Sequence, residues 1–110
     1  MPFIDLDTRA GTEAMPGIIL RTFWGEQMLF SHVTLTPNSV VPAHSHPHEQ
    51  GGIVVQGEME LPIGDETRLL KVRDMYIAPG GVEHSVVAGP DGCIALDIFS
   101  PVREEYKFAQ

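Results

Sequence analysis

The sequence is poor in cysteine and lacks long apolar runs. Cys93 is the only cysteine among 110 residues, so no intrachain disulfide can form and nothing indicates an oxidising compartment. The apolar residues that follow Cys93 predict a buried, unreactive thiol. The N-terminus has no basic region followed by an apolar run, which argues against a signal peptide. There is also no stretch of about 18 apolar residues that would predict a transmembrane helix, so we expect a cytoplasmic protein.

Positive charge is scarce as well. Seven Lys and Arg stand against 15 Asp and Glu, which gives a formal net charge of −8. Nucleic acids are bound by basic stripes, and anionic membrane surfaces repel an acidic chain, so we expect neither as a partner. A small anionic substrate is compatible with this composition, because one metal ion and one arginine can reverse the local field.

Helical periodicity is the third absence. Short apolar and β-branched runs recur every 8–12 residues or so, separated by turns rich in Gly, Pro, Asn and Asp. This pattern predicts an all-β sandwich or barrel. We expect one β-barrel domain over residues 16–110, an irregular segment at residues 1–15, and a single helical turn within residues 103–108. The expected strands are 18–24, 27–36, 40–43, 53–56, 59–63, 67–72, 75–78, 85–88 and 93–99, with a turn at 89–92.

Histidines, in contrast, are concentrated. Three of the five lie within five positions, at His44, His46 and His48. On an extended strand these residues and Gln50 would share one face. Imidazoles and an amide oxygen on one face are ligands that suit a divalent transition metal. His84, after a Pro-x-Gly turn, is a further candidate ligand.

Some members of this stretch fit the metal set less well. Pro47 restricts the residue before it and could move His48 away from the other histidines. Glu49 has the wrong parity, and His32, an isolated histidine, is interpreted as structural. A surface histidine patch or a cluster that titrates with pH is the alternative to a metal site.

The C-terminal part of the chain contains groups that suit a sugar acid. Asp97 and Phe99 share a strand face, and Arg103 follows a Pro-broken strand end. Arginine binds a carboxylate through two hydrogen bonds, and an aspartate can act as a general acid or base. The alternative is an ion pair between Asp97 and Arg103 at the surface, with Phe99 in the core.

Two segments resemble the motifs of the cupin family. The first is matched at the family's spacings by Asn38, His44, His46, Gln50 and Gly57, with Asn38 at a glycine position. The second is matched by Arg73, Pro79, Gly81, His84 and Ala88, with Arg73 at a glycine position and Ala88 in place of Asn. Asn38 tolerates the left-handed region, whereas Arg73 suggests ordinary backbone angles at its turn. The resemblance implies a single-domain, small jelly-roll barrel.

The ligand set narrows the resemblance. With Gln50 where most cupins carry Glu, the chain resembles the small pectin- and alginate-degradation cupins that act on 4,5-unsaturated uronates. That resemblance implies one divalent metal (Zn, Ni, Fe, Mn or Co) held by His44, His46, Gln50 and His84. It implies conversion of unsaturated monouronates from the cyclic to the linear keto form. Neutral ligands leave the ion its full charge, which favours Lewis-acid polarisation of a bound oxygen.

The same resemblance suggests roles for the C-terminal residues. Asp97 and Arg103 would be catalytic, Asp97 moving a proton and Arg103 holding the substrate carboxylate. Phe99 would join Arg103 in substrate binding by packing against the ring.

Two other functions fit the same residues. One is another cupin enzyme, such as an iron-dependent dioxygenase or a different isomerase, and the other is a non-catalytic metal- or small-ligand-binding cupin. We also expect a homodimer, as in other small cupins. Apolar residues 18–20, with Phe23 and Trp24, could form its interface unless they are barrel core.

Overall fold

The computed structural model describes residues 2–108 and is all-β, as the sequence predicts. Its strands are joined by short turns, and a 3-10 turn lies near each end of the described chain. The elements are η1 (Leu6–Thr8), β1 (Thr12–Met15), β2 (Ile18–Trp24), β3 (Leu29–Leu35), β4 (Val40–His44), β5 (Glu49–Ile63), β6 (Glu66–Lys71), β7 (Met75–Ala78), β8 (His84–Ser100) and η2 (Glu104–Tyr106). The tail turn predicted within residues 103–108 is therefore confirmed. No helix among these elements is long and apolar enough to cross a membrane.

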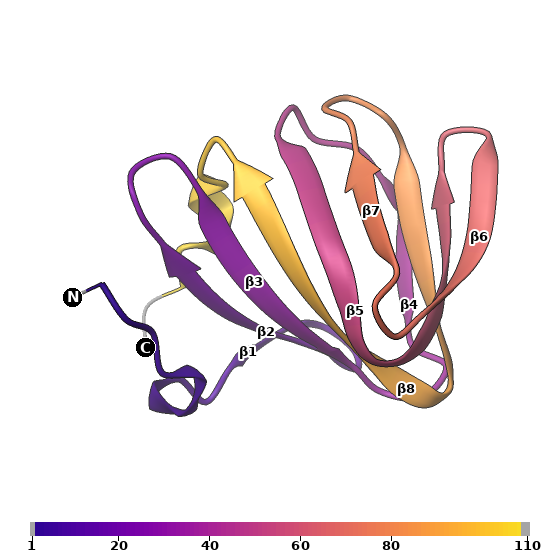
Figure 1. Ribbon diagram of the computed structural model, residues 1–110, viewed down its shortest axis with the longest axis horizontal. Helices are drawn as coiled ribbons and strands as arrows, with labels where there is room; N and C mark the ends of the chain where they lie inside the picture. Colours follow the sequence, from indigo (N-terminus) through magenta and orange to yellow (C-terminus); the bar gives the residue numbers. More distant parts are fainter. Residues whose placement is uncertain (1, 109–110) are drawn as a thin grey trace.

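The two longest strands, β5 and β8, belong to both sheets of the barrel (Figure 1). The second half of β8 lies between β3 and the first half of β5, and β1, β2 and β7 complete this sheet. The other halves of β5 and β8 pair again, flanked by β6 and β4. Two antiparallel sheets that share bent strands form a jelly-roll barrel. In Figure 1 the sheets meet at the bottom and diverge toward the top.

Two interruptions predicted from the sequence are wrong. The stretches 53–56 and 59–63 form one strand, β5, and residues 89–92 lie inside β8 instead of forming a turn. The pairing of β5 with β8 shifts register between Gly57 and Met59, and Gly57 and Gly92 both have positive φ. A Cβ on Gly57 would overlap the carbonyl of Gly92. These glycines mark bulges that bend the long strands. In the sequence, a glycine at a bulge cannot be distinguished from a glycine at the end of a strand.

The segment at residues 1–15 is less irregular than the sequence predicts. Residues 12–15 form β1, which pairs with β2 at the edge of the larger sheet. The run is too short to show a strand period, but the free edge of β2 supplies its hydrogen-bond partners.

One turn departs from its predicted conformation. Arg73 has φ 79°, so the expectation of ordinary backbone angles there is wrong, whereas Asn38, at φ 61°, is left-handed as expected. The amide of Arg73 donates to the carbonyl of Val54, and that of Asp74 donates to the carbonyl of Lys71. These two bonds hold the tight turn and impose the left-handed angle on Arg73 despite its Cβ.

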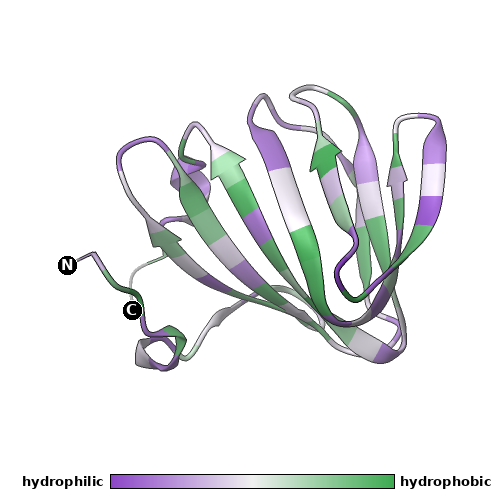
Figure 2. Cartoon of the chain, viewed as in Figure 1, coloured by the Kyte–Doolittle hydropathy of each residue, from purple (hydrophilic) through white to green (hydrophobic). Residues whose placement is uncertain are grey.

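The barrel core is built from alternate positions of the strands. Figure 2 shows apolar and polar segments alternating along β8. The inward side chains of β3 are all buried, as are those of β2 as far as Thr22. The core cluster comprises Ile18, Leu20, Val33, Leu35, Val54, Met59, Leu61, Leu70, Ala88, Cys93 and Ala95. Ile18 and Leu20 are therefore barrel core and cannot supply a dimer interface. Cys93 is buried as predicted, and burial raises the pKa of its thiol to about 11.

Candidate metal centre and adjoining pocket

Three histidines converge where β4 ends and β8 begins. His44, the last residue of β4, is paired with His84, the first residue of β8, and His46 lies in the loop that follows β4. Their candidate ligand nitrogens lie within 4.8 Å of one another. Ligand atoms at about 2.0–2.2 Å from a shared ion would be separated by less than this, so small side-chain adjustments suffice to bind one ion.

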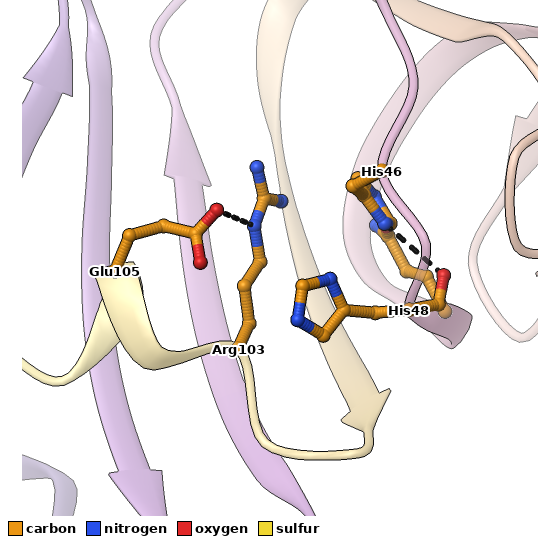
Figure 3. A network of polar contacts seen from close by, with 5 residues as sticks. His46, His48, Arg103 and Glu105 are labelled. Atoms are coloured by element: carbon orange, nitrogen blue, oxygen red, sulfur yellow. Dashed lines mark hydrogen bonds and ion pairs between the residues drawn. The ribbon is translucent and has the colours of Figure 1, made fainter.

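The route to this convergence differs from the predicted one. Residues 45–48 do not continue the strand. The chain bends at Pro47, and Gln50 reaches the site from β5, which starts at Glu49. His48 lies outside the three-histidine cluster, as expected from Pro47, and its backbone oxygen accepts a hydrogen bond from Nδ1 of His46 at 3.1 Å (Figure 3). The candidate ligands are brought together by a turn and strand pairing, not by parity along one strand.

The hydrogen bonds of the histidines prepare them to bind a metal. Nδ1 of His44 bonds the carbonyl of Pro42 at 2.9 Å, and Nδ1 of His84 bonds that of Val82 at 3.0 Å. A carbonyl only accepts, so Nδ1 carries the proton in these rings and in His46, and Nε2 keeps a free lone pair. Nε2 of His84 is buried and has no hydrogen-bond partner among residues 2–108. An orphaned nitrogen lone pair beside two other imidazoles fits a divalent transition metal.

The local electrostatics favour the neutral form of two of these rings, His46 and His84. Burial lowers the pKa of His46 most, and the positive charge of Arg103 lowers it further. Burial is also the main cause that lowers the pKa of His84. Neutral imidazole is the form that binds metals.

Gln50 is oriented by contacts at both ends of its amide. Its side-chain oxygen lies 3.0 Å from Nε2 of His46, and its side chain also hydrogen-bonds Asp97. A carboxylate accepts, so the amide nitrogen faces Asp97 and the oxygen faces the histidines. A free lone pair on His46 and this oxygen repel each other, unless a cation or a proton lies between them. The donor set therefore fits a metal held by three imidazoles and one amide oxygen.

Asp97 lies beside this cluster, deep in the barrel. It is 9% exposed, and its carboxylate accepts a hydrogen bond from the Tyr76 hydroxyl. Burial raises the pKa of Asp97 to about 6, against the opposing effect of the bonds from Tyr76 and Gln50. A carboxyl with this pKa can take up or release a proton near neutral pH.

Tyr76 is a pocket residue that no sequence pattern above predicts. The signal for it is the Gly51-Gly52 pair, because a glycine inside a strand often marks a close approach of another group. Tyr76 and Asp97 both face Gly52 across strand pairs.

Phe99 and Arg103 form the opposite wall. Phe99 is 2% exposed, and its ring centroid is 5.6 Å from that of His46. The guanidinium carbon of Arg103 lies 4.0 Å from the ring centroid of Tyr106 and 5.3 Å from that of Phe99. Nε of Arg103 pairs with Oε2 of Glu105 at 3.2 Å (Figure 3). The ion pair considered between Asp97 and Arg103 is not formed, because each carries a different partner.

One pocket joins both groups of residues. Its polar lining includes His44, Gln50, Tyr76, His84, Asp97 and Arg103. Apolar side chains of the barrel, among them Leu61 and Val86, complete its walls together with Phe99 and Tyr106. An apolar cavity with a few convergent polar groups is typical of a small-molecule site.

Comparisons with known proteins agree with this fold. Residues 31–99 match the family model of the cupin domain. The pectin degradation protein KdgF of Dickeya dadantii is 31% identical over 84 residues, which cover 76% of either protein. The H2HPP isomerase of Bacillus subtilis is 38% identical over 74 residues, which span 66% of this chain but 30% of that protein. The solved structure of KdgF from Halomonas sp. superposes with a TM-score of 0.89 at 28% identity, covering 96% of this chain and 97% of that one.

Proposed function

The chain belongs to the cupin family, and on that basis we propose that it is a metal-dependent enzyme that converts 4,5-unsaturated monouronates from the cyclic to the linear keto form. The single observation that carries the proposal is the pocket lined by both groups of residues. His44, His84 and Gln50 line one side, and Asp97, Phe99 and Arg103 lie against them. His46 completes the imidazole set from its place beside Phe99. The likeness to two KdgF proteins supports a sugar-acid substrate.

The reaction is an isomerisation that needs no oxidant and no water. Opening the ring breaks the bond between C1 and the ring oxygen. The C1 hydroxyl loses its proton as the aldehyde forms, and the ring oxygen gains a proton to become an enol. The proton on the enol oxygen is then lost and another is added to C4, which leaves a ketone at C5 and removes the C4–C5 double bond. Each step moves protons, which is the task of a general acid and base.

Different residues of the pocket bind the metal and transfer the protons. His44, His46, Gln50 and His84 would hold the ion, which supplies Lewis-acid polarisation of a substrate oxygen when bound. Asp97, with a pKa near 6, accepts a proton from one oxygen and returns one to the substrate during tautomerisation.

Arg103 and Phe99 orient the substrate. The guanidinium carbon of Arg103 lies 4.0 Å from the centre of the Tyr106 ring, and Glu105 pairs with its Nε. Its terminal nitrogens can therefore pair with the substrate carboxylate. Phe99, buried between His46 and Arg103, offers an apolar face to the sugar ring. Fixing the carboxylate and the ring sets the distance between Asp97 and the reacting atoms.

A different isomerase is the second candidate function. It is supported by the 38% identity with the H2HPP isomerase, although this chain covers 30% of that protein. The same Asp97 and metal ligands would move protons on another small acid. The identity of the metal, a cytoplasmic location and a homodimer remain predictions.

The proposal is tested with purified protein, stripped with a chelator and reloaded separately with Zn, Ni, Fe, Mn or Co. Turnover of an unsaturated monouronate is followed by loss of the absorbance of its conjugated double bond, with metal content measured on the same sample. We expect metal-dependent loss of absorbance that is equally fast without oxygen. Oxygen-dependent turnover would indicate a dioxygenase instead. Tight binding of the uronate without turnover, with every metal, would make the protein a binding module and refute the proposal.

A further inference from the structure

We propose that Tyr76 is a positioning residue for Asp97 and that Gly52 provides the space in which the two side chains meet. The inference rests on the proposed function, because it gives the Tyr76 hydroxyl a purpose in the reaction assigned to Asp97. It concerns a residue that is not a candidate metal ligand and whose ring packs against the barrel core, so the group in question is its hydroxyl.

The strand register brings the three residues into one row. Gly52 on β5 is paired with Tyr76 on β7 and, on its other side, with Asp97 on β8. Paired residues point to the same face of a sheet, here the inside of the barrel. Neighbouring strands are about 4.8 Å apart, so Tyr76 and Asp97 start roughly 10 Å from each other. Their side chains can meet only by crossing above the strand between them.

Gly52 keeps this crossing open. A Cβ at position 52 would overlap the Tyr76 hydroxyl, the ring carbon that carries it and Oδ1 of Asp97. The neighbouring Gly51 differs, because a Cβ there would meet only the backbone oxygen of Tyr76, at 3.7 Å. The absence of a side chain is therefore needed at one glycine of the pair and not at the other.

The Tyr76 hydroxyl is one of two side-chain donors to the Asp97 carboxylate in the part of the chain that the structure describes. Gln50 holds Asp97 from the direction of the metal centre. On the far side β3 places Ser31 opposite Asp97, yet the buried Ser31 hydroxyl has no hydrogen-bond partner in the described part of the chain. Tyr76 is thus the second fixed donor to Asp97, and two donors hold a carboxylate in one rotamer better than one.

Loss of the Tyr76 hydroxyl should misplace the proton carrier without removing any group that binds the substrate carboxylate. We expect Tyr76→Phe to lower kcat by about 10- to 100-fold, the effect of a misplacement near 1 Å. The KM and the metal content should stay within about twofold of wild type. If the hydroxyl were merely structural, its loss would change the stability of the protein to urea. It would not lower kcat selectively while KM stays the same.

The experiment compares Tyr76→Phe, Gly52→Ala, their double variant and Gly51→Ala as the matched control. Both single variants remove the same hydrogen bond, so kcat of the double variant should equal that of the slower single variant. Gly51→Ala should keep wild-type kcat. The inference would be overturned if the fold losses in kcat of the two single variants multiplied in the double variant. It would also be overturned if Tyr76→Phe kept the kcat of wild type.

The two proposals fail in different ways. If the wild-type protein turns over no unsaturated uronate with any metal, the proposed function is wrong and the role of Tyr76 falls with it. If the wild type is active and Tyr76→Phe is equally active, only the positioning role is wrong. Urea unfolding of each variant, measured alongside, identifies any loss of kcat caused by unfolding at the assay temperature.

Discussion

The side-chain oxygen of Gln50 lies 3.0 Å from Nε2 of His46, although one residue is in strand β5 and the other in the loop before it. The hydrogen bond of the Gln50 side chain to Asp97 sets the direction of the amide. Gln50 therefore joins the candidate metal centre to the candidate proton carrier. Different substitutions at this position should change metal affinity and turnover independently. Gln50 is therefore the most informative ligand to vary.

Gln50→Ala should lower metal affinity by about 10- to 100-fold or more. Mutation of residues that only orient metal ligands already lowers affinity by this factor. Gln50→Glu should bind metal at least as tightly as wild type, because it adds a negative charge, and should turn over uronate more slowly, because the ion is a weaker Lewis acid. Competition with a chromogenic chelator measures the affinity. Gln56→Glu, an exposed position on the same strand, is the control for net charge. Faster turnover by Gln50→Glu would contradict the role given to the neutral amide.

Arg103→Ala should lower kcat/KM for the uronate by about 30-fold or more, mainly through KM, because removing one partner of a buried charge pair typically costs about 2–5 kcal/mol. Arg103→Lys should recover little, since an ammonium lacks the planar group that stacks on Tyr106 and pairs with a carboxylate. Steady-state kinetics on an unsaturated monouronate measure both. Arg68→Ala, on an exposed position of β6, removes the same charge away from the pocket. An unchanged KM in Arg103→Ala would reject the carboxylate contact.

Asp97→Asn should stabilise the metal-free protein at neutral pH. Asp97 has a folded-state pKa of about 6, above its ordinary value, so the folded protein holds this proton to higher pH than the unfolded chain. Burying this carboxyl therefore does not lower the free energy of unfolding below about pH 4, where it is protonated in both states. Above pH 6 it lowers the free energy of unfolding by about 1–3 kcal/mol. Urea unfolding should show Asp97→Asn more stable than wild type by that amount at pH 7.5 and equal to it near pH 3.5. Asp91→Asn, an exposed position, serves as the control. A stability difference that grows as the pH falls would have the wrong sign.

Gly57→Ala should destabilise the barrel far more than Gly81→Ala. Both glycines have positive φ, 75° and 80°, which costs a Cβ-bearing residue about 1–2 kcal/mol. A Cβ on Gly81 meets nothing within 4 Å, whereas one on Gly57 overlaps the Gly92 carbonyl. The Gly57 variant should lose about 3 kcal/mol or more of unfolding free energy, from angle and overlap together. Equal losses in urea unfolding would mean that the bulge between β5 and β8 is not tightly packed.

Much of the fold follows from local patterns. The strands β2 and β7 begin and end at the predicted residues, because alternating or β-branched runs there are bounded by Gly, Pro and Asp. The breaks predicted at Gly57 and at residues 89–92 are wrong for one reason. A glycine gives the same local signal whether the chain turns back or bends through a bulge, and only the pairing of β5 with β8 distinguishes the two.

The candidate site, like the fold, is predicted in part from the sequence. Ligand chemistry and spacing in the sequence single out His44, His46 and His84, which the structure brings together. The predicted cause, shared parity on one strand, is wrong, because Pro47 ends the extended run and strand pairing completes the cluster. Arginine as a residue type does not predict the left-handed conformation of Arg73, which is held by one hydrogen bond to the distant Val54 and one within the turn, from Asp74 to Lys71.

The all-β class, the buried Cys93 and the residue types able to hold a metal follow from the sequence alone, since these depend on side-chain chemistry and on period along the chain. Which of those side chains meet depends on the tertiary structure. The row of Tyr76, Gly52 and Asp97 requires the register of three strands that are far apart in sequence. Register is fixed by burial of whole sheet faces, a global property that no local pattern specifies.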